Sequence, residues 1–281
     1  MILIVDSGAT KTDWGFCEKG DPGNATIVRT EGMNASTMRF DDILKIVNNA
    51  SEQAGKEITR EVEHIYFYGA GIVSKESAMP VHDALMYVFP RAYMLHCSSD
   101  LAGAAIALFG HGKGVAAIMG TGSTSCLYEN GRIIKNISPG GFILGDEGSG
   151  AALGKMLLSD YFKELVPEDF VRLIDAEFDI RYSDAVSKIY KGEAPSRYLA
   201  SFAKFIIAHK EHEYAASLID KNLRSFIERS LCRYGCSEIG VIGSIGLACR
   251  EDLTRLGAEY GLNFTTFLQS PVQSLISYHG L

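Results

Sequence analysis

Residues 6–14 read DSGATKTDW, a run of small and hydroxyl side chains between two apolar segments. The preceding run, residues 2–5, predicts a short buried strand, and residues 13–17 predict a second one. The stretch between them therefore predicts a tight hairpin loop. Backbone amides in such a loop can approach phosphate oxygens closely, although an ordinary glycine-containing hairpin is the alternative interpretation.

Four residues of this stretch are candidates for nucleotide chemistry. Gly8 allows the backbone to come close to a phosphate, and the hydroxyls of Thr10 and Thr12 can donate to its oxygens. Asp6 is a candidate to hold Mg²⁺ largely through water, because this hard cation prefers carboxylate and water oxygens.

A second loop of the same kind follows the glycine-rich stretch at 110–114, which we expect to be a linker between domains. Residues 120–125 read GTGSTS between two further predicted strands, and Gly120, Gly122 and Ser123 are candidate phosphate contacts. Two α/β halves that each begin with a glycine-tipped hairpin would suit a nucleotide held between two domains. Residues 147–234 are predicted to be mostly helical, so the two halves are unequal.

Acidic residues occupy two further positions of interest. Asp100 follows two serines at a predicted helix start, where a carboxylate is either a helix cap or a base that removes a proton from an attacking hydroxyl. Residues 140–150 read GGFILGDEGSG, and the adjacent acids Asp146 and Glu147 could accept hydrogen bonds from sugar hydroxyls or carry first-turn helix charges. Residues 241–246, VIGSIG, predict a strand–glycine–helix junction that can pack under an adenine ring.

Composition limits the partners and the compartment. The net charge of −7 argues against a nucleic-acid or anionic-membrane surface, and no segment of 281 residues reaches the length of about 20 apolar residues that a membrane span needs. The start of the chain lacks the features of a signal peptide, and the six scattered cysteines are typical of reduced core thiols. We expect a cytoplasmic protein.

Taken in order, these motifs resemble the N-acetylglucosamine kinase and BadF/BadG ATPase family of the actin/hexokinase/Hsp70 superfamily. The resemblance spans nearly the whole chain, and GGFILGDEGSG is its most specific string. It implies an α/β fold of two actin-like (ribonuclease H-like) domains, each built on a mixed five-stranded sheet, with ATP and sugar in the cleft between them. The domains would be 1–110, rejoined by a last helix at about 268–281, and 111–267.

The resemblance also implies roles for single residues. Asp100 is similar to the base that activates the 6-hydroxyl of the sugar. The residues that would line the sugar site with it are Asn34, Gly71, Thr121, Gly145 and Asp146. Thr10, Lys11 and Thr12 with Gly122 and Ser123 would surround the phosphates, and Gly243 and Ser244 would lie near the nucleoside. The expected ligands are MgATP and an amino sugar, and the family suggests a homodimer.

Three alternatives stay open on the sequence. The substrate could be N-acetylmuramic acid, glucosamine or another amino sugar. The protein could instead be an ATPase that activates a dehydratase or reductase partner, although Cys97 and Cys126 do not stand in the cysteine context of such a protein. A sugar-responsive repressor would need a DNA-binding domain ahead of the first strand, for which we expect no room.

Overall fold

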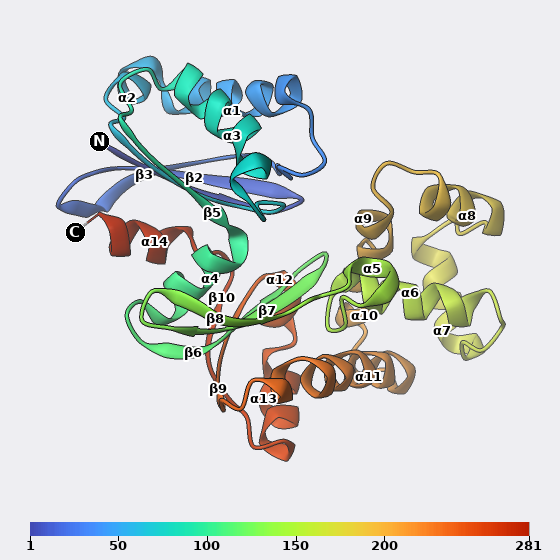
Figure 1. The fold of residues 1–281 in the computed structure, drawn as a ribbon. Helices are drawn as coiled ribbons and strands as arrows, with labels where there is room; N and C mark the ends of the chain where they lie inside the picture. Colours follow the sequence, from blue (N-terminus) through green and yellow to red (C-terminus); the bar gives the residue numbers. More distant parts are fainter. Residues whose placement is uncertain (281) are drawn as a thin grey trace. The chain divides into compact units, whose positions relative to one another are not determined.

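The computed structural model describes residues 1–280 and divides the chain into two compact units (Figure 1). The first unit comprises Met1–Ala116, Tyr128–Ile134 and the C-terminal segment that begins at Ser270, and the second comprises Ala117–Leu127 and Lys135–Gln269. The domains drawn from the sequence, 1–110 with 268–281 and 111–267, stay a prediction.

The first unit is built on a mixed five-stranded sheet with the order β3-β2-β1-β4-β5. Its strands are β1 (Ile2–Ser7), β2 (Lys11–Glu18), β3 (Asp21–Glu31), β4 (His64–Gly69) and β5 (Met94–Ser99). β1 pairs antiparallel with β2 and parallel with β4, and β4 pairs parallel with β5. The carboxyl ends of β1, β4 and β5 therefore share one edge of the sheet, where the polar residues after each strand gather.

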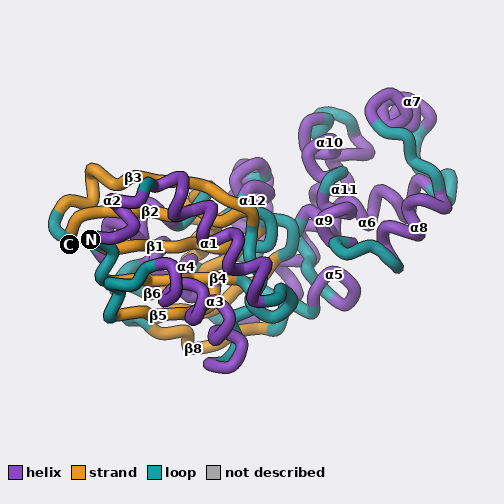
Figure 2. The backbone as a smooth tube through the Cα atoms, turned by 90° about the horizontal axis from the view of Figure 1, so that it is seen from above, coloured by secondary structure: helices purple, strands orange, loops and turns teal. Residues whose placement is uncertain are grey.

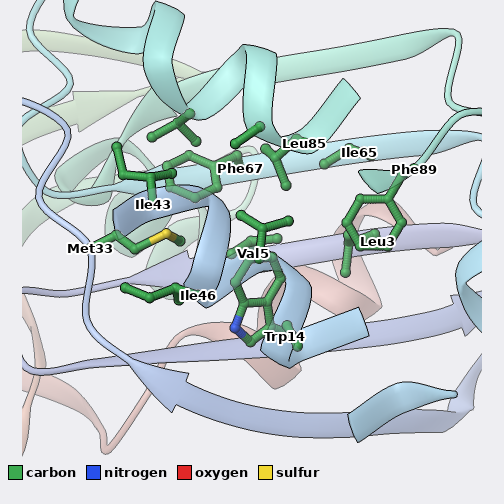
Figure 3. Packing of buried hydrophobic residues seen from close by; sticks show 14 of the residues in the cluster. Leu3, Val5, Trp14, Met33, Ile43, Ile46, Ile65, Phe67, Leu85 and Phe89 are labelled. Atoms are coloured by element: carbon green, nitrogen blue, oxygen red, sulfur yellow. The ribbon is translucent and has the colours of Figure 1, made fainter. Parts of the chain in front are cut away.

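Helices cover both faces of this sheet. They are α1 (Phe40–Ala54), α2 (Lys56–Arg60), α3 (Lys75–Val88), α4 (Asp100–Phe109) and α14 (Val272–His279). Because side chains alternate along a strand, Leu3 and Val5 of β1 pack with the α1 and α3 side chains, whereas Ile2 and Ile4 pack with Leu275 and Ile276 of α14. Figure 3 shows the first of these clusters.

Trp14 lies in the middle of the first cluster (Figure 3) and is fully buried, as its position on the second strand predicts. Its indole nitrogen donates to Thr30 Oγ1 over 2.8 Å, so the one polar atom of the ring is satisfied inside the core.

The second sheet has the order β10-β9-β6-β7-β8. Its strands are β6 (Lys113–Met119), β7 (Ser123–Glu129), β8 (Arg132–Ile137), β9 (Glu238–Ile242) and β10 (Asn263–Leu268). Asn130 and Gly131 have positive φ of 49° and 81°, which is the geometry that the two-residue hairpin between β7 and β8 requires. β10 is not predicted from the sequence, because NFTTFL is too short and too polar to show a strand period.

The helices of the second unit confirm the mostly helical prediction for 147–234. They are α5 (Gly141–Leu144), α6 (Gly150–Tyr161), α7 (Glu168–Glu177), α8 (Tyr182–Tyr190), α9 (Pro195–Ala200), α10 (Ala203–Ala208), α11 (Glu213–Arg229), the 3₁₀ turn η1 (Leu231–Arg233), α12 (Ser244–Ala248) and α13 (Arg250–Glu259). Figure 2 shows α6 to α11 as helices joined by loops, with no strand among them.

The expectation of a linker at 110–114 is wrong in detail. Gly110 ends α4 with a φ of 53° and a hydrogen bond from its amide to Ile106 O, and β6 already begins at Lys113. Gly110 therefore serves a tight helix-to-strand connection, in which its positive φ favours glycine.

Two chain-wide expectations concern membranes and thiols. Of the helices within residues 1–280, none combines the length and apolar character that crossing a membrane requires. All six cysteines are free thiols, and Cys17, Cys126 and Cys249 are buried as expected. Cys232 is exposed, in contrast to the expected core thiol, because η1 lies at the surface.

Candidate functional site

The first predicted loop is a hairpin in the structure, with residues 8–10 between β1 and β2. The Gly8 amide donates to Lys11 O over 3.0 Å, and Thr10 is exposed at the tip. Thr12 is buried instead, and its hydroxyl donates to Glu31 O over 2.9 Å. Thr10 thus has a position open to a ligand, whereas the Thr12 side chain is held inside the sheet.

Gly32 supports this loop and was not predicted. A Cβ at Gly32 would lie 2.4 Å from Gly8 O and 2.5 Å from Thr10 N, so the chain after β3 passes directly against the loop backbone. Only glycine permits this approach. An isolated glycine between Glu31 and Met33 carries no signal in the sequence that would set it apart.

Asp13 forms a buried ionic centre next to the loop. Its carboxylate accepts hydrogen bonds from Arg29 Nε at 2.6 Å, Ser270 Oγ at 2.8 Å and Lys11 Nζ at 3.2 Å. Burial raises the pKa of Asp13, but these three donors outweigh it and hold the pKa below its usual range. Asp13 is therefore a carboxylate that positions Lys11, and sequence reasoning missed it.

Asp6 faces Asp13 across the β1–β2 pair and lies near Asp100. Its pKa is raised to about 7, first by burial and then by the charges of Asp13 and Asp100, against smaller opposing effects of Lys11 and Ser270. A carboxyl flanked by two acids gains most from a bound cation, because the cation offsets their repulsion. Asp6 thus fits the predicted magnesium contact.

The donor set at Asp6 suits a cation that keeps its water shell. Within the described 280 residues, no three His, Cys, Asp or Glu side chains gather closely enough to enclose a metal ion. Mg²⁺ dehydrates reluctantly and is commonly held by one or two carboxylates with several waters. The residues around Asp6 therefore suit Mg²⁺ that is held partly through water and not by protein ligands alone.

Asp100 is the first residue of α4, and the capping role falls to its neighbour. Ser99 Oγ accepts a hydrogen bond from the Ala102 amide over 3.2 Å, which makes Ser99 the N-cap. Asp100 Oδ1 accepts from the Leu101 amide over 2.8 Å. Burial raises the pKa of Asp100 despite backbone hydrogen bonds from Leu101 and from its own amide, so its carboxylate takes up a proton more readily than an exposed one.

Asn34 and Gly71 are neighbours at the same sheet edge. Asn34 forms an isolated parallel bridge with Ala70, and a Cβ at Gly71 would lie 2.3 Å from Asn34 Oδ1. Ser36 ties the two segments together, since its hydroxyl donates to Gly71 O over 2.6 Å and its amide to Asn34 Oδ1 over 3.0 Å. With a φ of 80°, Gly71 occupies a conformation that favours glycine. The first unit thus gathers its predicted sugar and phosphate residues along one edge.

In the second unit, the GTGSTS loop joins β6 to β7 and receives the start of α6. The amides of Gly150 and Ala151 donate to Gly120 O at 2.8 Å and Thr121 O at 3.0 Å. Ser123 Oγ donates to Glu147 O over 2.6 Å. The loop and the GDEGSG turn therefore form one hydrogen-bonded body.

Asp146 lies against this loop. A Cβ at Gly122 would stand 2.9 Å from Asp146 Oδ2, and the buried Asp146 has a φ of 58°, which aspartate tolerates better than most residues. Burial raises the pKa of its carboxyl, and the Ser123 amide partly opposes this. At Gly145 an added Cβ would approach Pro139 O to 1.9 Å, so this glycine allows the turn to close.

α11 holds the GDEGSG turn from behind, a feature that the sequence did not reveal. The buried Asn222 accepts from the Gly148 amide at 2.9 Å and donates to Ser149 O at 3.1 Å. At the C-terminal end of α11, Arg229 Nε pairs with Glu147 Oε1 at 2.6 Å. Glu147 is thus engaged within the protein, which leaves Asp146 as the acid of this turn for a ligand.

The predicted strand–glycine–helix junction lies between β9 and α12. Gly243 has a φ of 118°, its amide donates to Leu268 O over 3.0 Å, and a Cβ there would approach Met119 O to 2.4 Å. Ser244 begins α12. Because Met119 directly precedes Gly120, the junction and the GTGSTS loop are neighbours in the second unit.

The fold defines the class. Two mixed five-stranded sheets with flanking helices are the architecture of actin-like ATPases and sugar kinases, and solved structures share it. The chain belongs to the BadF/BadG/BcrA/BcrD ATPase family, whose model matches residues 5–226. No curated protein matches the chain.

Three solved structures show how far the likeness extends. A proposed N-acetylglucosamine kinase from Porphyromonas gingivalis is 34% identical with a TM-score of 0.93, over 100% of this chain and 99% of that chain. A second proposed N-acetylglucosamine kinase, from Chromobacterium violaceum, is 17% identical with a TM-score of 0.69, over 99% and 98% of the two chains. A ROK hexokinase from Thermus thermophilus is 15% identical with a TM-score of 0.54, over 99% and 96%.

Proposed function

We propose that the protein is an ATP-dependent sugar kinase that phosphorylates the 6-hydroxyl of N-acetylglucosamine. The observation that supports the proposal is that Asp100 lies at the sheet edge that also holds Asp6 and the hairpin loop, so that the proposed base and the proposed magnesium contact are within electrostatic reach of each other. The 34% identical protein from Porphyromonas gingivalis, itself a proposed N-acetylglucosamine kinase, supports the choice of sugar.

In this proposal Asp100 accepts the proton of the attacking hydroxyl. A base works best when its pKa approaches the working pH, and burial shifts the pKa of Asp100 in that direction. Asn34, Gly71, Thr121, Gly145 and Asp146 would orient the sugar so that its hydroxyl faces the γ-phosphate of ATP. Such positioning supplies much of the rate enhancement in phosphoryl transfer.

The phosphates would be held by backbone and side-chain donors. The proposed contacts are Gly8, Thr10, Lys11, Thr12, Gly120, Gly122 and Ser123, with Gly243 and Ser244 near the nucleoside. Lys11 is oriented by its 3.2 Å contact with Asp13. For Thr12, whose hydroxyl is engaged by Glu31 O, the contribution to phosphate binding would come from the backbone. When bound, Mg²⁺ neutralises charge on the phosphate oxygens, and Asp6 would hold it through water.

The test is an ADP-release assay with MgATP and a panel of N-acetylglucosamine, N-acetylmuramic acid, glucosamine, N-acetylmannosamine and glucose. The proposal expects sugar-dependent release with a clear preference for N-acetylglucosamine. A preference for another amino sugar would keep the reaction and correct the substrate. Slow release that ignores every sugar would overturn the kinase and favour an ATPase that activates a protein partner.

The surroundings of two cysteines bear on the alternative of an ATPase that activates a protein partner. Cys97 is half-buried and Cys126 is buried. Burial raises the pKa of the Cys97 thiol to about 11 and that of the Cys126 thiol to about 12, so without a metal ion both stay protonated near neutral pH.

A further inference from the structure

The helices of the second unit line an open cavity of about 650 Å³ that the proposed reaction does not use. It lies among α5, α6, α8 and α9, and we call it the helical cavity. Its apolar wall includes Phe142, Ile143, Leu158, Phe162, Val186 and Ile189. A volume of this size falls within the range of about 300–1,000 Å³ that is typical of small-molecule sites.

Large apolar side chains at this cavity remain in contact with solvent. Ile143 is 72% exposed, Tyr182 67% and Tyr190 80%. Covering such side chains is favourable by about 25 cal/mol for each Å² removed from water. A ligand with an apolar body would gain this free energy by entering the cavity.

The charged lining of the cavity has one sign. Lys155 and Lys163 line it, and no acidic residue does. Lys155 Nζ donates to Phe142 O at 2.9 Å and Lys163 Nζ to Ser159 Oγ at 3.4 Å, and neither ammonium group has a carboxylate within salt-bridge distance among residues 1–280. An anionic group on the ligand would supply a direct ionic partner for either ammonium group.

We propose that the helical cavity binds a small organic anion with an aliphatic or aromatic body, and that its acid group pairs with a lysine of the lining, Lys155 or Lys163. Because the wall is concave and its lining carries two lysines, a compact ligand fits better than the flat face of a second protein copy. The proposal goes beyond the kinase reaction and does not depend on it.

Binding in the helical cavity would also reach the candidate sugar site. Phe142 and Ile143 belong to α5, which runs directly into Gly145 and Asp146. Lys155 holds α5 through Phe142 O, and its charge lowers the pKa of Asp146 against the effect of burial. A ligand that pairs with Lys155 would therefore act on the turn that carries Asp146.

The test uses 8-anilinonaphthalene-1-sulfonate as a fluorescent probe, displaced by decanoate or by decan-1-ol below the concentration at which decanoate forms micelles. The two competitors share an apolar body and differ in charge. We expect decanoate to displace the probe at roughly tenfold lower concentration than decan-1-ol, since a charge-assisted hydrogen bond contributes about that factor. In the double variant Lys155→Gln/Lys163→Gln, decanoate should weaken roughly tenfold while decan-1-ol stays unchanged.

Two further variants locate the site. Ile189→Glu places a carboxylate in the apolar wall and should abolish displaceable probe binding. Lys204→Gln removes an exposed lysine that does not line the cavity and should change nothing. Melting temperatures without ligand show that the variants fold.

Several results would overturn the proposal. Equal potency of decanoate and decan-1-ol would remove the role of the lysines. Unchanged probe binding in Ile189→Glu would place the probe elsewhere. A dimer in sedimentation that Ile189→Glu dissociates would show that a second copy covers the cavity.

Discussion

Asp13 in β2 accepts a hydrogen bond from the hydroxyl of Ser270 over 2.8 Å, although 257 positions separate the two residues in the chain. Ser270 stands just before α14 (Figure 1). Leu275 and Ile276 of this helix pack on side chains of β1 and β2. The last segment of the chain is thus attached to the strand that follows the candidate phosphate loop, at the carboxylate that also orients Lys11.

The substitution Ser270→Ala tests this attachment. It removes one donor from a buried carboxylate, and we expect the free energy of unfolding to fall by about 1–3 kcal/mol. Chemical denaturation measures it. Ser277→Ala is the matched control, because Ser277 is exposed and bonds only to Gln273 O within α14, so its effect should stay within about 0.5 kcal/mol. Equal effects of the two substitutions would contradict the role given to the Asp13–Ser270 bond.

The substitution Asp100→Asn tests the proposed base. Asparagine keeps the size of the side chain but cannot take up the proton, so turnover should fall by about 10²–10⁴-fold while nucleotide affinity is retained. Steady-state kinetics and calorimetric nucleotide binding give the two quantities. Asp83→Asn, an exposed aspartate on α3, should leave both unchanged. Wild-type turnover in Asp100→Asn would remove Asp100 from its assigned role.

The substitution Asn222→Leu tests the support of the GDEGSG turn. It leaves the Gly148 amide and Ser149 O without their buried partner. We therefore expect the free energy of unfolding to fall by up to about 1–3 kcal/mol for each of the two groups. Because Asp146 precedes these residues in the same turn, the KM for the sugar should rise as well. Asn49→Leu, at an exposed position on α1, is the control. A variant as stable as the wild type, with the same KM, would show that the turn holds its shape alone.

Two glycines should respond differently to alanine. At Gly243 the φ of 118° and a Cβ approach of 2.4 Å to Met119 O predict a loss of stability of about 1–3 kcal/mol. At Gly8 the nearest atom to an added Cβ is Lys11 O at 3.6 Å, so Gly8→Ala should fold normally. If the loop amides hold phosphate, the methyl group would hinder that approach and nucleotide affinity should fall by about tenfold. Thermal unfolding with and without MgATP separates the two effects, and unchanged affinity in Gly8→Ala would count against the phosphate loop.

His279 should make stability depend on pH. Its ring stacks on Tyr66 with 3.8 Å between centroids, and its Nε2 hydrogen-bonds to Tyr68 Oη at 2.8 Å. Burial, with a smaller effect of nearby His96, lowers its pKa from 6.5 to about 4. Between pH 6.5 and 4, His279 is therefore protonated in the unfolded chain but not in the folded chain. Because the unfolded chain binds the additional proton, the free energy of unfolding falls as pH decreases through this window.

The substitution His279→Phe isolates this contribution. Phenylalanine keeps the ring but does not titrate, so the loss of stability between pH 7 and pH 5 should be smaller than in the wild type. The difference is at most about 1.4 kcal/mol for each pH unit below 6.5. Denaturant unfolding at both pH values measures it. The same loss of unfolding free energy in the two proteins would show that another group causes the loss of stability at low pH.

Both loops could be predicted from the sequence, because glycine and hydroxyl residues between short apolar runs restrict the backbone locally. The fold is predicted from the resemblance of these motifs, taken in order, to a known family. The positions that support the site could not be predicted. Asp13 looks like a surface residue of an edge hairpin until β3 and Ser270 cover it, and Asn222 lies in a helix whose neighbours are ordinary core residues. Each gains its role from partners more than ten positions away, and a single sequence carries no signal for such pairs.

The two bonds of Asn222 have a consequence for how the chain can vary. They join the turn before α6 to α11, so both ends of the helical segment between these helices are fixed at the turn that carries Asp146. α9 is bound to α6, since the backbone of Leu199 packs on Gly154, and α7 is bound to α10 and α11 through the buried ring of Phe170, which packs on Phe205 and Tyr214. Relatives could therefore vary the exposed loops between these helices while the packed helices and Asp146 stay in place.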